Sequence, residues 1–348
     1  MRPEEPGADD TVRIPPRPPL RRRRGTPLVA VAVVVVLLAG AAGGWLWWSR
    51  SAAPPVIASA PVATALPPAV ATAPEASSPP PTIAAPPAFA VATATEQQIL
   101  DNVSTDLTVF RFADNPRILV LDFASLHDQG KMLNRVAALT EKAGLPHDRV
   151  ISDSELGAAI SARGDTVETF YYGHDYAAAS LARFFDLADR EHVELDRQEA
   201  RLRALLAQEG WFAPGVAAGL ITLPAVGSDP KMTAAARAAI LRHELSHGEF
   251  FSNPLYAEFV RNFWLTILTD AERTTFRGFL AKEEYDPTLE ELMFNEMQAY
   301  LMFTRDPSFF SPGLAGLTQT RLTELQSRFL AGMPAGWLHE VLASYPAK

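Results

Sequence analysis

The first hydrophobic feature of the chain is one uninterrupted apolar run near the N-terminus. Residues 28–48 contain no charge and are long enough to cross a bilayer as a helix rising about 1.5 Å per residue. Four consecutive arginines at 21–24 precede the run, and three tryptophans lie at its far end. Arginines stay on the cytoplasmic side of a membrane, and indoles favour its interface. The pattern predicts a basic cytoplasmic arm at 1–27, a single transmembrane helix at 28–48 and an extracytoplasmic remainder.

A cleaved signal peptide is the alternative interpretation of this run. The run is longer than the apolar region of a usual signal peptide. The small-residue sequence Ala58-Ser59-Ala60 is followed at once by Pro61, which disfavours cleavage there. An uncleaved anchor in the plasma membrane is therefore the favoured prediction.

The next segment, residues 49–94, has the composition of a linker. Eleven prolines fall between positions 54 and 87, among alanine, valine, serine and threonine. Such a stretch cannot bury a core, so we expect it to be disordered and partly extended. It would hold the following domain away from the membrane.

Residues 95–348 show the periodicities of a folded, mostly helical α+β domain with a small sheet. Strands are expected at 117–123, 150–151, 169–172 and 219–224. Helices are expected at 96–100, 129–143, after Ser152, at 177–190, 193–208, 232–247, after Asn253, after Thr269, after Asp286, at 318–329 and at 336–342. The strand at 219–224 ends in proline, which edge strands tolerate, and an edge strand can pair with an extended peptide. A buried interior strand fits this sequence equally well.

Charge and cysteine content narrow the chemistry of this domain. The whole chain has a formal net charge of −9, and the basic arm contributes +3, which leaves −12 on residues 95–348. An acidic domain argues against a nucleic-acid partner. The absence of cysteine excludes disulfides and thiolate ligands, so any metal site must use His, Asp or Glu.

The expected helix at 232–247, for which Ser228-Asp229-Pro230 offers a cap and a first-turn proline, carries the candidate chemistry. His243, Glu244 and His247 match the pattern H-E-x-x-H. Residues four apart share one helix face, so both imidazoles can reach one Zn²⁺ ion. Glu244 lies beside them, where a general base could take a proton from water activated by the metal. The alternative is a surface helix that carries two histidines by chance, and a third ligand would decide against it.

Glu296 is the candidate for that third ligand. It lies on the apolar stripe of the helix expected after Asp286, among Leu292, Met293 and Ala299. An unpaired carboxylate is expensive to bury and needs a cation there. Glu290 and Glu291 lie on the side of the helix away from this stripe. A partly exposed glutamate at the edge of the stripe is the alternative.

The motif H-E-x-x-H, followed downstream by N-E-x-x-A at residues 295–299, resembles the gluzincin zinc metallopeptidases. The resemblance implies a zincin-like fold, His243, His247 and Glu296 as zinc ligands, and Glu244 as the general base. It covers two short helices and the strand at 219–224. At position 300, where many members have an acidic residue that orients a ligand histidine, this chain has Tyr300. The second shell is therefore unassigned, and the candidates for stabilising an oxyanion are Tyr300, His174 and His339.

The sequence thus predicts a membrane-anchored zinc hydrolase, with a peptide or protein substrate in the cell envelope. Two other interpretations stay open. One is a non-catalytic module with a structural metal, which would need a fourth protein ligand such as Glu249 or His174. The other is a metal-free interaction protein of the cell envelope. A third histidine in the metzincin spacing does not follow the motif, which excludes that family.

Overall fold

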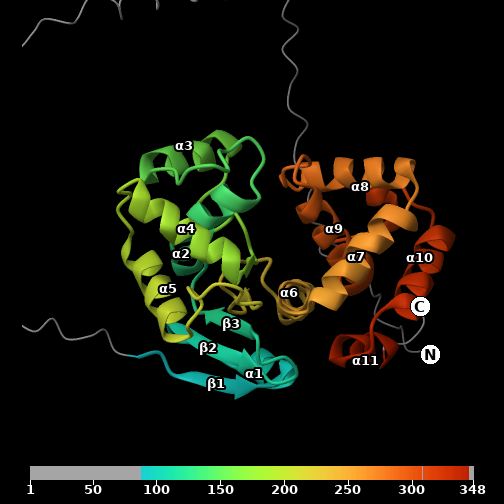
Figure 1. Ribbon diagram of the computed structural model, residues 1–348, viewed down its shortest axis with the longest axis horizontal. Helices are drawn as coiled ribbons and strands as arrows, with labels where there is room; N and C mark the ends of the chain where they lie inside the picture. The colour runs from blue at the N-terminus through green and yellow to red at the C-terminus, as the bar shows by residue number, and fades with distance from the viewer. Residues whose placement is uncertain (1–87, 308, 345–348) are drawn as a thin grey trace, which may run out of the picture. The chain divides into compact units, whose positions relative to one another are not determined.

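The computed structural model describes residues 88–307 and 309–344 (Figure 1). The strands are β1 (Val91–Ala94), β2 (Leu107–Phe112), β3 (Ile118–Phe123), β4 (Asp175–Ala177) and β5 (Gly219–Pro224). The α-helices are α1 (Glu96–Asp101), α2 (Leu126–Thr140), α3 (Asp153–Arg163), α4 (Ala178–Arg190), α5 (Arg197–Gln208), α6 (Ala234–Ser252), α7 (Pro254–Thr266), α8 (Asp270–Lys282), α9 (Glu290–Gln298), α10 (Gln319–Gly332) and α11 (Trp337–Ser344). A π-helix, η1 (Ala299–Phe303), continues α9, and a short 3₁₀ helix is η2 (Pro312–Ala315).

The arm predicted at 1–27, the transmembrane helix predicted at 28–48 and most of the linker predicted at 49–94 lie outside the described residues. Among the helices that are described, none combines the length and the apolar character needed to cross a bilayer. The folded part is a mostly helical α+β domain with one small mixed sheet, as the periodicities predict.

The sheet has the strand order β1-β2-β3-β5-β4. Strands β1 and β2 are parallel, as are β3 and β5, whereas the β2/β3 and β5/β4 pairs are antiparallel. Every residue of β3 and β5 is buried, as expected for central strands covered on both faces. The interior interpretation of 219–224 is therefore correct, and β4 is the edge strand beside it. The register of β4 reaches only as far as Ile221, so Pro224 needs no partner on that side.

Some strand predictions are wrong. Strand β1 lies inside the segment assigned to the linker, so the folded region begins before residue 95. Strand β2 was not expected, and no strand forms at 150–151. The strand expected at 169–172 is a turn closed by bonds from the Thr169 and Phe170 amides to the Thr166 carbonyl. The strand forms a few residues later, at β4.

Helix predictions hold where the capping chemistry is strong. Ser152 and Glu155 form the reciprocal capping box of α3, and Asn253 caps α7, with proline in its first turn. The start of α6 is different. The predicted cap at 228–230 forms a turn, and the helix begins after Thr233, whose side chain accepts from the Ala236 amide.

Helices cover both faces of the sheet, and a further group packs beyond α6 (Figure 1). Helices α2, α4 and α5 bury one face in a core that contains Leu119, Leu121 and Leu220. Helix α6 covers the other face, where Val120 and Ile221 point. Helices α7 to α11 form a separate core with α9 and η1 at its centre. Because α6 lies between the sheet and this C-terminal core, most of the side chains along the helix are buried.

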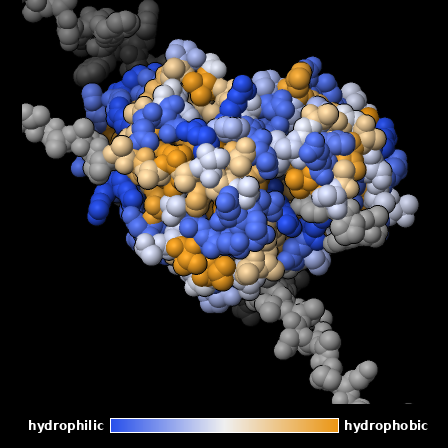
Figure 2. All heavy atoms as spheres, turned by 90° about the horizontal axis from the view of Figure 1, so that it is seen from below, coloured by the Kyte–Doolittle hydropathy of each residue, from blue (hydrophilic) through white to orange (hydrophobic). Residues whose placement is uncertain are grey.

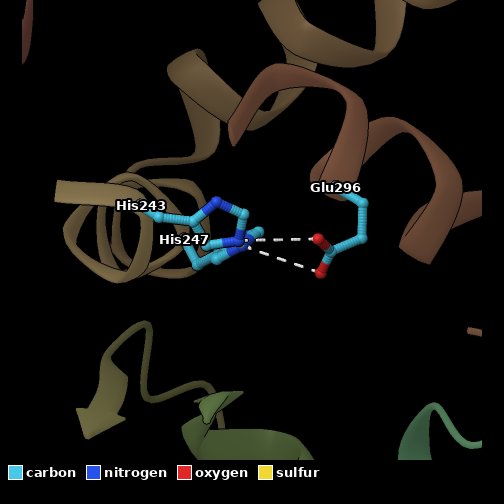
Figure 3. Close-up of side chains that lie close together, drawn as sticks. All are labelled: His243, His247 and Glu296. Atoms are coloured by element: carbon cyan, nitrogen blue, oxygen red, sulfur yellow. Dashed lines mark hydrogen bonds and ion pairs between the residues drawn. The ribbon is translucent and has the colours of Figure 1, made fainter. Parts of the chain in front are cut away.

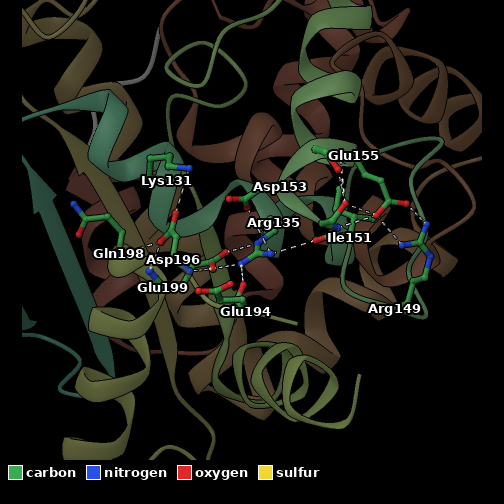
Figure 4. Close-up of polar contacts among 12 residues, drawn as sticks. Lys131, Arg135, Arg149, Ile151, Asp153, Glu155, Glu194, Asp196, Gln198 and Glu199 are labelled. Carbon is green, nitrogen blue, oxygen red and sulfur yellow. Dashed lines mark hydrogen bonds and ion pairs between the residues drawn. The ribbon is translucent and has the colours of Figure 1, made fainter. Parts of the chain in front are cut away.

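Two buried ion pairs tie these layers together. Arg237 of α6 donates two hydrogen bonds to Asp122 of β3, at 2.9 and 3.0 Å, and both side chains are almost fully buried. On the opposite face, Arg135 of α2 pairs with Glu199 of α5 and donates to the carbonyl of Glu194 (Figure 4). Removing one member of such a pair leaves an uncompensated buried charge, so both pairs fix the positions of their helices.

A short backbone pairing joins the N-terminal and C-terminal parts of the domain. The Ala143 amide donates to the Glu284 carbonyl at 3.0 Å, and the Asp286 amide donates to the Glu141 carbonyl at 2.8 Å. This pairing brings the end of α2 next to the segment that leads into α9.

The surface is mostly hydrophilic. Figure 2 shows polar side chains over much of the face seen from below, with hydrophobic ones in small groups. The exposed large hydrophobic residues are distributed over separate elements; the most exposed are Val103 before β2 and Leu255 in α7. Scattered exposure of this kind is normal for a folded domain and does not indicate a docking surface.

Candidate metal centre

Helix α6 presents the motif residues from a position that two glycines fix. A Cβ atom on Gly219 would lie 2.9 Å from the Gly248 Cα, and one on Gly248 would lie 2.9 Å from the Ile118 side chain. The helix therefore approaches β3 and β5 more closely than any larger residue would allow. The motif side chains that precede Gly248 are buried, with 8 % of His243, 6 % of Glu244 and 0 % of His247 exposed.

Helix α9 brings Glu296 to the two histidines (Figure 3). Glu296 is fully buried, and its carboxylate oxygens lie 3.7 Å from His243 Nε2 and 3.6 Å from His247 Nε2. The two imidazole Nε2 atoms are 3.0 Å apart. Helix α9 therefore packs against the face of α6 that carries both histidines, as the third-ligand prediction requires. Glu291 is exposed, as expected, and Glu290 is bonded to Trp264 on the outer side of the helix.

The hydrogen bonds of the two histidines define which ring nitrogen is free. The Thr304 hydroxyl lies 2.7 Å from His243 Nδ1 and 3.1 Å from the Ala299 carbonyl. The Asn295 side-chain carbonyl, an acceptor, lies 3.0 Å from His247 Nδ1. Both rings therefore have a hydrogen-bond partner at Nδ1 and direct Nε2 toward Glu296.

Three groups that can bind a metal thus converge on one point. The two Nε2 atoms are 3.0 Å apart, and neither Glu296 oxygen has a hydrogen-bond partner of good geometry among the described residues. Ligand atoms on a tetrahedral zinc ion, with bonds of about 2.0–2.1 Å, lie about 3.3 Å apart, close to the spacings here. The donor set of two imidazoles and one carboxylate suits Zn²⁺. His243, His247 and Glu296 therefore fit a divalent cation.

The pKa values of Glu296 and His243 are shifted because both side chains are buried. Burial raises the pKa of Glu296 to about 8; nearby His247 and a hydrogen bond from the Tyr285 side chain oppose this shift, and Asp175 adds to it. Burial lowers the pKa of His243 to about 4, so the ring resists taking up a compensating proton. The charged form of Glu296 is therefore unfavourable unless a cation binds beside it.

Glu244 lies beside the three candidate ligands. Burial, reinforced by Asp175, Glu296 and Glu141, raises its pKa well above the ordinary value. Its carboxylate packs against the backbone of Gly173, where an added Cβ atom would lie 2.1 Å from Oε1. One Glu244 oxygen has no hydrogen-bond partner in the described part of the chain.

Several residues around the centre were not singled out from the sequence. Asp175 of β4 has a carboxylate oxygen 3.6 Å from His247 Nδ1. Together with Glu244 and His247 it forms a second group of side chains close enough to hold a metal ion. Asn295 belongs to the quoted N-E-x-x-A motif, and its position beside Glu296 was the available signal. For Thr304 the sequence offers no such signal, because its place depends on the π-helix after α9.

The other candidates from the sequence take different positions. Tyr300 packs edge-on against His243, with ring centroids 4.9 Å apart. His174 is buried and bonded through Nδ1 to Tyr176, and burial lowers its pKa to about 3. Glu249 points away, bonded to Asn115, Asn253 and Trp337. Within the described residues, the group of possible ligands around Glu296 includes neither His174, Glu249 nor His339. The structural-metal alternative thereby loses both of its proposed fourth ligands.

No protein family, curated protein or solved structure was found to match this chain. The likeness to gluzincins therefore stands on the motif residues alone.

Proposed function

We propose that this protein is a zinc-dependent hydrolase, with peptides or proteins of the cell envelope as its substrates and an N-terminal helix as its membrane anchor. The observation that carries the proposal is the convergence of two imidazole Nε2 atoms and one buried carboxylate, whose oxygens have no hydrogen bond of good geometry among the described residues, on one point. Natural proteins rarely keep buried polar atoms unsatisfied unless a ligand completes them.

The residues of the centre would have separate roles. His243, His247 and Glu296 would hold the ion, with Thr304 and Asn295 fixing the two rings. When bound, zinc supplies a Lewis acid that acidifies water and polarises a carbonyl group. Glu244, held against Gly173, would accept the proton from water. Its raised pKa suits this role, because a carboxyl group that holds its proton more firmly can carry the proton and return it to the leaving group.

The proposal of a peptide substrate rests on the resemblance to gluzincins and on the position of strand β4. This strand is the last of the sheet in the described residues, and its Asp175 lies next to His247. An extended peptide can add to such an edge through backbone hydrogen bonds. The strand expected to have this role from the sequence, β5, is covered by β4.

Metal analysis of the full chain, purified in detergent, tests the centre first. We expect about one zinc per chain, a strong loss of zinc in Glu296→Ala, and no loss in Glu291→Ala, the exposed neighbour on the same helix. The metal-free interaction protein predicts no stoichiometric zinc in any of the three.

Hydrolysis of a mixed peptide library, followed by mass spectrometry, tests the activity. Glu244→Gln should keep zinc and lose about 10²- to 10⁴-fold in rate, because the amide preserves the shape but cannot accept a proton. Equal rates for the wild type and this variant would remove Glu244 from the mechanism. Zinc binding without any cleavage would favour the structural-metal alternative.

A further inference from the structure

The π-helix that follows α9 places a hydroxyl where it contacts a candidate ligand. A π-helix is rare and often marks a functional position, because its wider turn changes which residues face a neighbouring element. Here η1 covers residues 299–303, and Thr304 follows it at once. Thr304 is buried, with 7 % of its surface exposed. It lies eight residues after Glu296.

Thr304 has two hydrogen-bond partners. Its hydroxyl lies 3.1 Å from the Ala299 carbonyl, inside the wide turn of η1, and 2.7 Å from His243 Nδ1. A histidine that binds a metal through Nε2 carries its proton on Nδ1, so the Thr304 oxygen would then accept that proton and donate its own to the Ala299 carbonyl. The hydroxyl therefore suits the tautomer that metal binding requires, and it sets the orientation of the ring.

Tyr300 does not take this role. It packs its ring edge-on against the His243 ring, one helical turn before Thr304. In gluzincins with an acidic residue at this position, a carboxylate orients the histidine. Here the contact to His243 Nδ1 comes from a neutral oxygen four residues further on.

We propose that Thr304 is the positioning residue of His243, and that it replaces a carboxylate by a neutral acceptor in the second shell of the metal centre. The proposal rests on the metal centre proposed above. A carboxylate partner raises the basicity of a ligand histidine, whereas a hydroxyl does so less. The structure thus assigns to His243 an oriented but weakly polarised imidazole, which binds zinc less tightly and leaves the ion a stronger Lewis acid.

The test compares Thr304→Val with Thr304→Ser in the full chain. Valine keeps the branched shape and loses the acceptor, whereas serine keeps the hydroxyl. Zinc affinity is measured by competition with a chromogenic chelator, and the geometry of the site by the absorption spectrum of the Co²⁺-substituted protein. We expect zinc affinity to fall about 10- to 100-fold in Thr304→Val, with a changed cobalt spectrum, and to remain near the wild-type value in Thr304→Ser.

Thr222→Val is the matched control for a purely structural loss. Thr222 is fully buried, and its hydroxyl accepts the His174 amide at 2.9 Å rather than bonding to a candidate ligand. This change should lower the unfolding midpoint of the metal-free protein without changing zinc affinity.

Each outcome decides one claim. Unchanged zinc affinity in Thr304→Val would overturn the positioning role, while the metal centre itself would stand. Equal losses in the valine and serine variants would show that side-chain shape matters rather than the hydroxyl, and would also overturn it. A wild-type protein that binds no zinc would instead refute the proposed function, on which this inference depends.

Discussion

Replacing Glu296 by glutamine should have opposite effects on the stability of the metal-free and the zinc-loaded protein. The change keeps the shape of the side chain and removes its charge. In the metal-free protein that charge, which forms as the pH rises through about 8, is buried beside two neutral imidazoles and has no compensating cation. In the loaded protein the same charge would be one of three bonds to the ion.

The magnitude follows from the pKa of Glu296. Burial raises that pKa to about 8 in the folded chain, from an ordinary value of 4.5. Because the folded pKa is the higher one, the contribution to stability is fully present below about pH 4.5 and is lost as the pH rises through 8. Linkage gives a loss of about 1 kcal/mol by pH 5 and about 4 kcal/mol by pH 8. Glutamine has no such titration.

Urea unfolding at pH 5 and pH 8, in a strong chelator, measures the difference. Between these two pH values the wild type should lose roughly 3 kcal/mol more than Glu296→Gln. This double difference cancels the cost of packing the amide, which does not depend on pH. Glu291→Gln, at an exposed position on the same helix, should behave like the wild type.

Zinc should then reverse the order at pH 8. At a free concentration a thousand times its dissociation constant, an ion stabilises the native state by about 4 kcal/mol. Glu296→Gln should gain far less, because it lacks one ligand. Identical pH dependence in the two metal-free proteins would refute the assignment of a buried, unpaired charge. An equal gain from zinc would refute the assignment of Glu296 as a ligand.

Three further predictions concern the surroundings of the centre. Gly173→Ala should keep zinc but reduce hydrolysis by a factor similar to that of Glu244→Gln, because its Cβ atom would displace the Glu244 carboxylate; full activity would contradict the packing. Arg237→Ala should destabilise the protein by about 3–5 kcal/mol in urea unfolding, because it leaves Asp122 buried and unpaired; a change below about 1 kcal/mol would show that the pair contributes little. Protease added to spheroplasts should digest residues 95–348 and spare the N-terminal arm, whereas a soluble cytoplasmic protein would exclude the anchor.

The sequence was most informative where the chemistry is local. The H-E-x-x-H spacing places two imidazoles on one face of any helix, and the apolar neighbours of Glu296 predict its burial. Capping residues such as Ser152 and Asn253 determined where their helices begin. Each of these signals lies within a few residues, so no knowledge of the fold is needed to interpret it.

The parts that the sequence did not reveal depend on contacts between distant segments. Strand β1 has a short sequence, Val-Ala-Thr-Ala, with no strict alternation, and it becomes a strand by pairing with β2. The edge position belongs to β4 because the His174 carbonyl accepts from the Thr222 amide, 48 residues away. Thr304 faces His243 only because a π-helix shifts the face of the chain that follows α9. None of these partners is visible in a local periodicity.

The convergence of candidate ligands at the centre is maintained from two independent sides. On the sheet side, Arg237 and the close approach of Gly248 fix α6 against β3 and β5. On the other side, Gln298 cross-links the helices: it donates to Ser246 of α6 at 3.0 Å and accepts from Tyr256 of α7 at 2.7 Å.

Because these anchors do not involve the candidate ligands, the frame can hold His243, His247 and Glu296 together before any ion binds. Holding these three side chains close together lowers the stability of the metal-free protein, and an ion that binds between them restores that stability. Zinc should therefore raise the unfolding midpoint without changing the far-ultraviolet circular dichroism spectrum. A large gain of helix on zinc addition would show instead that the ion assembles the site.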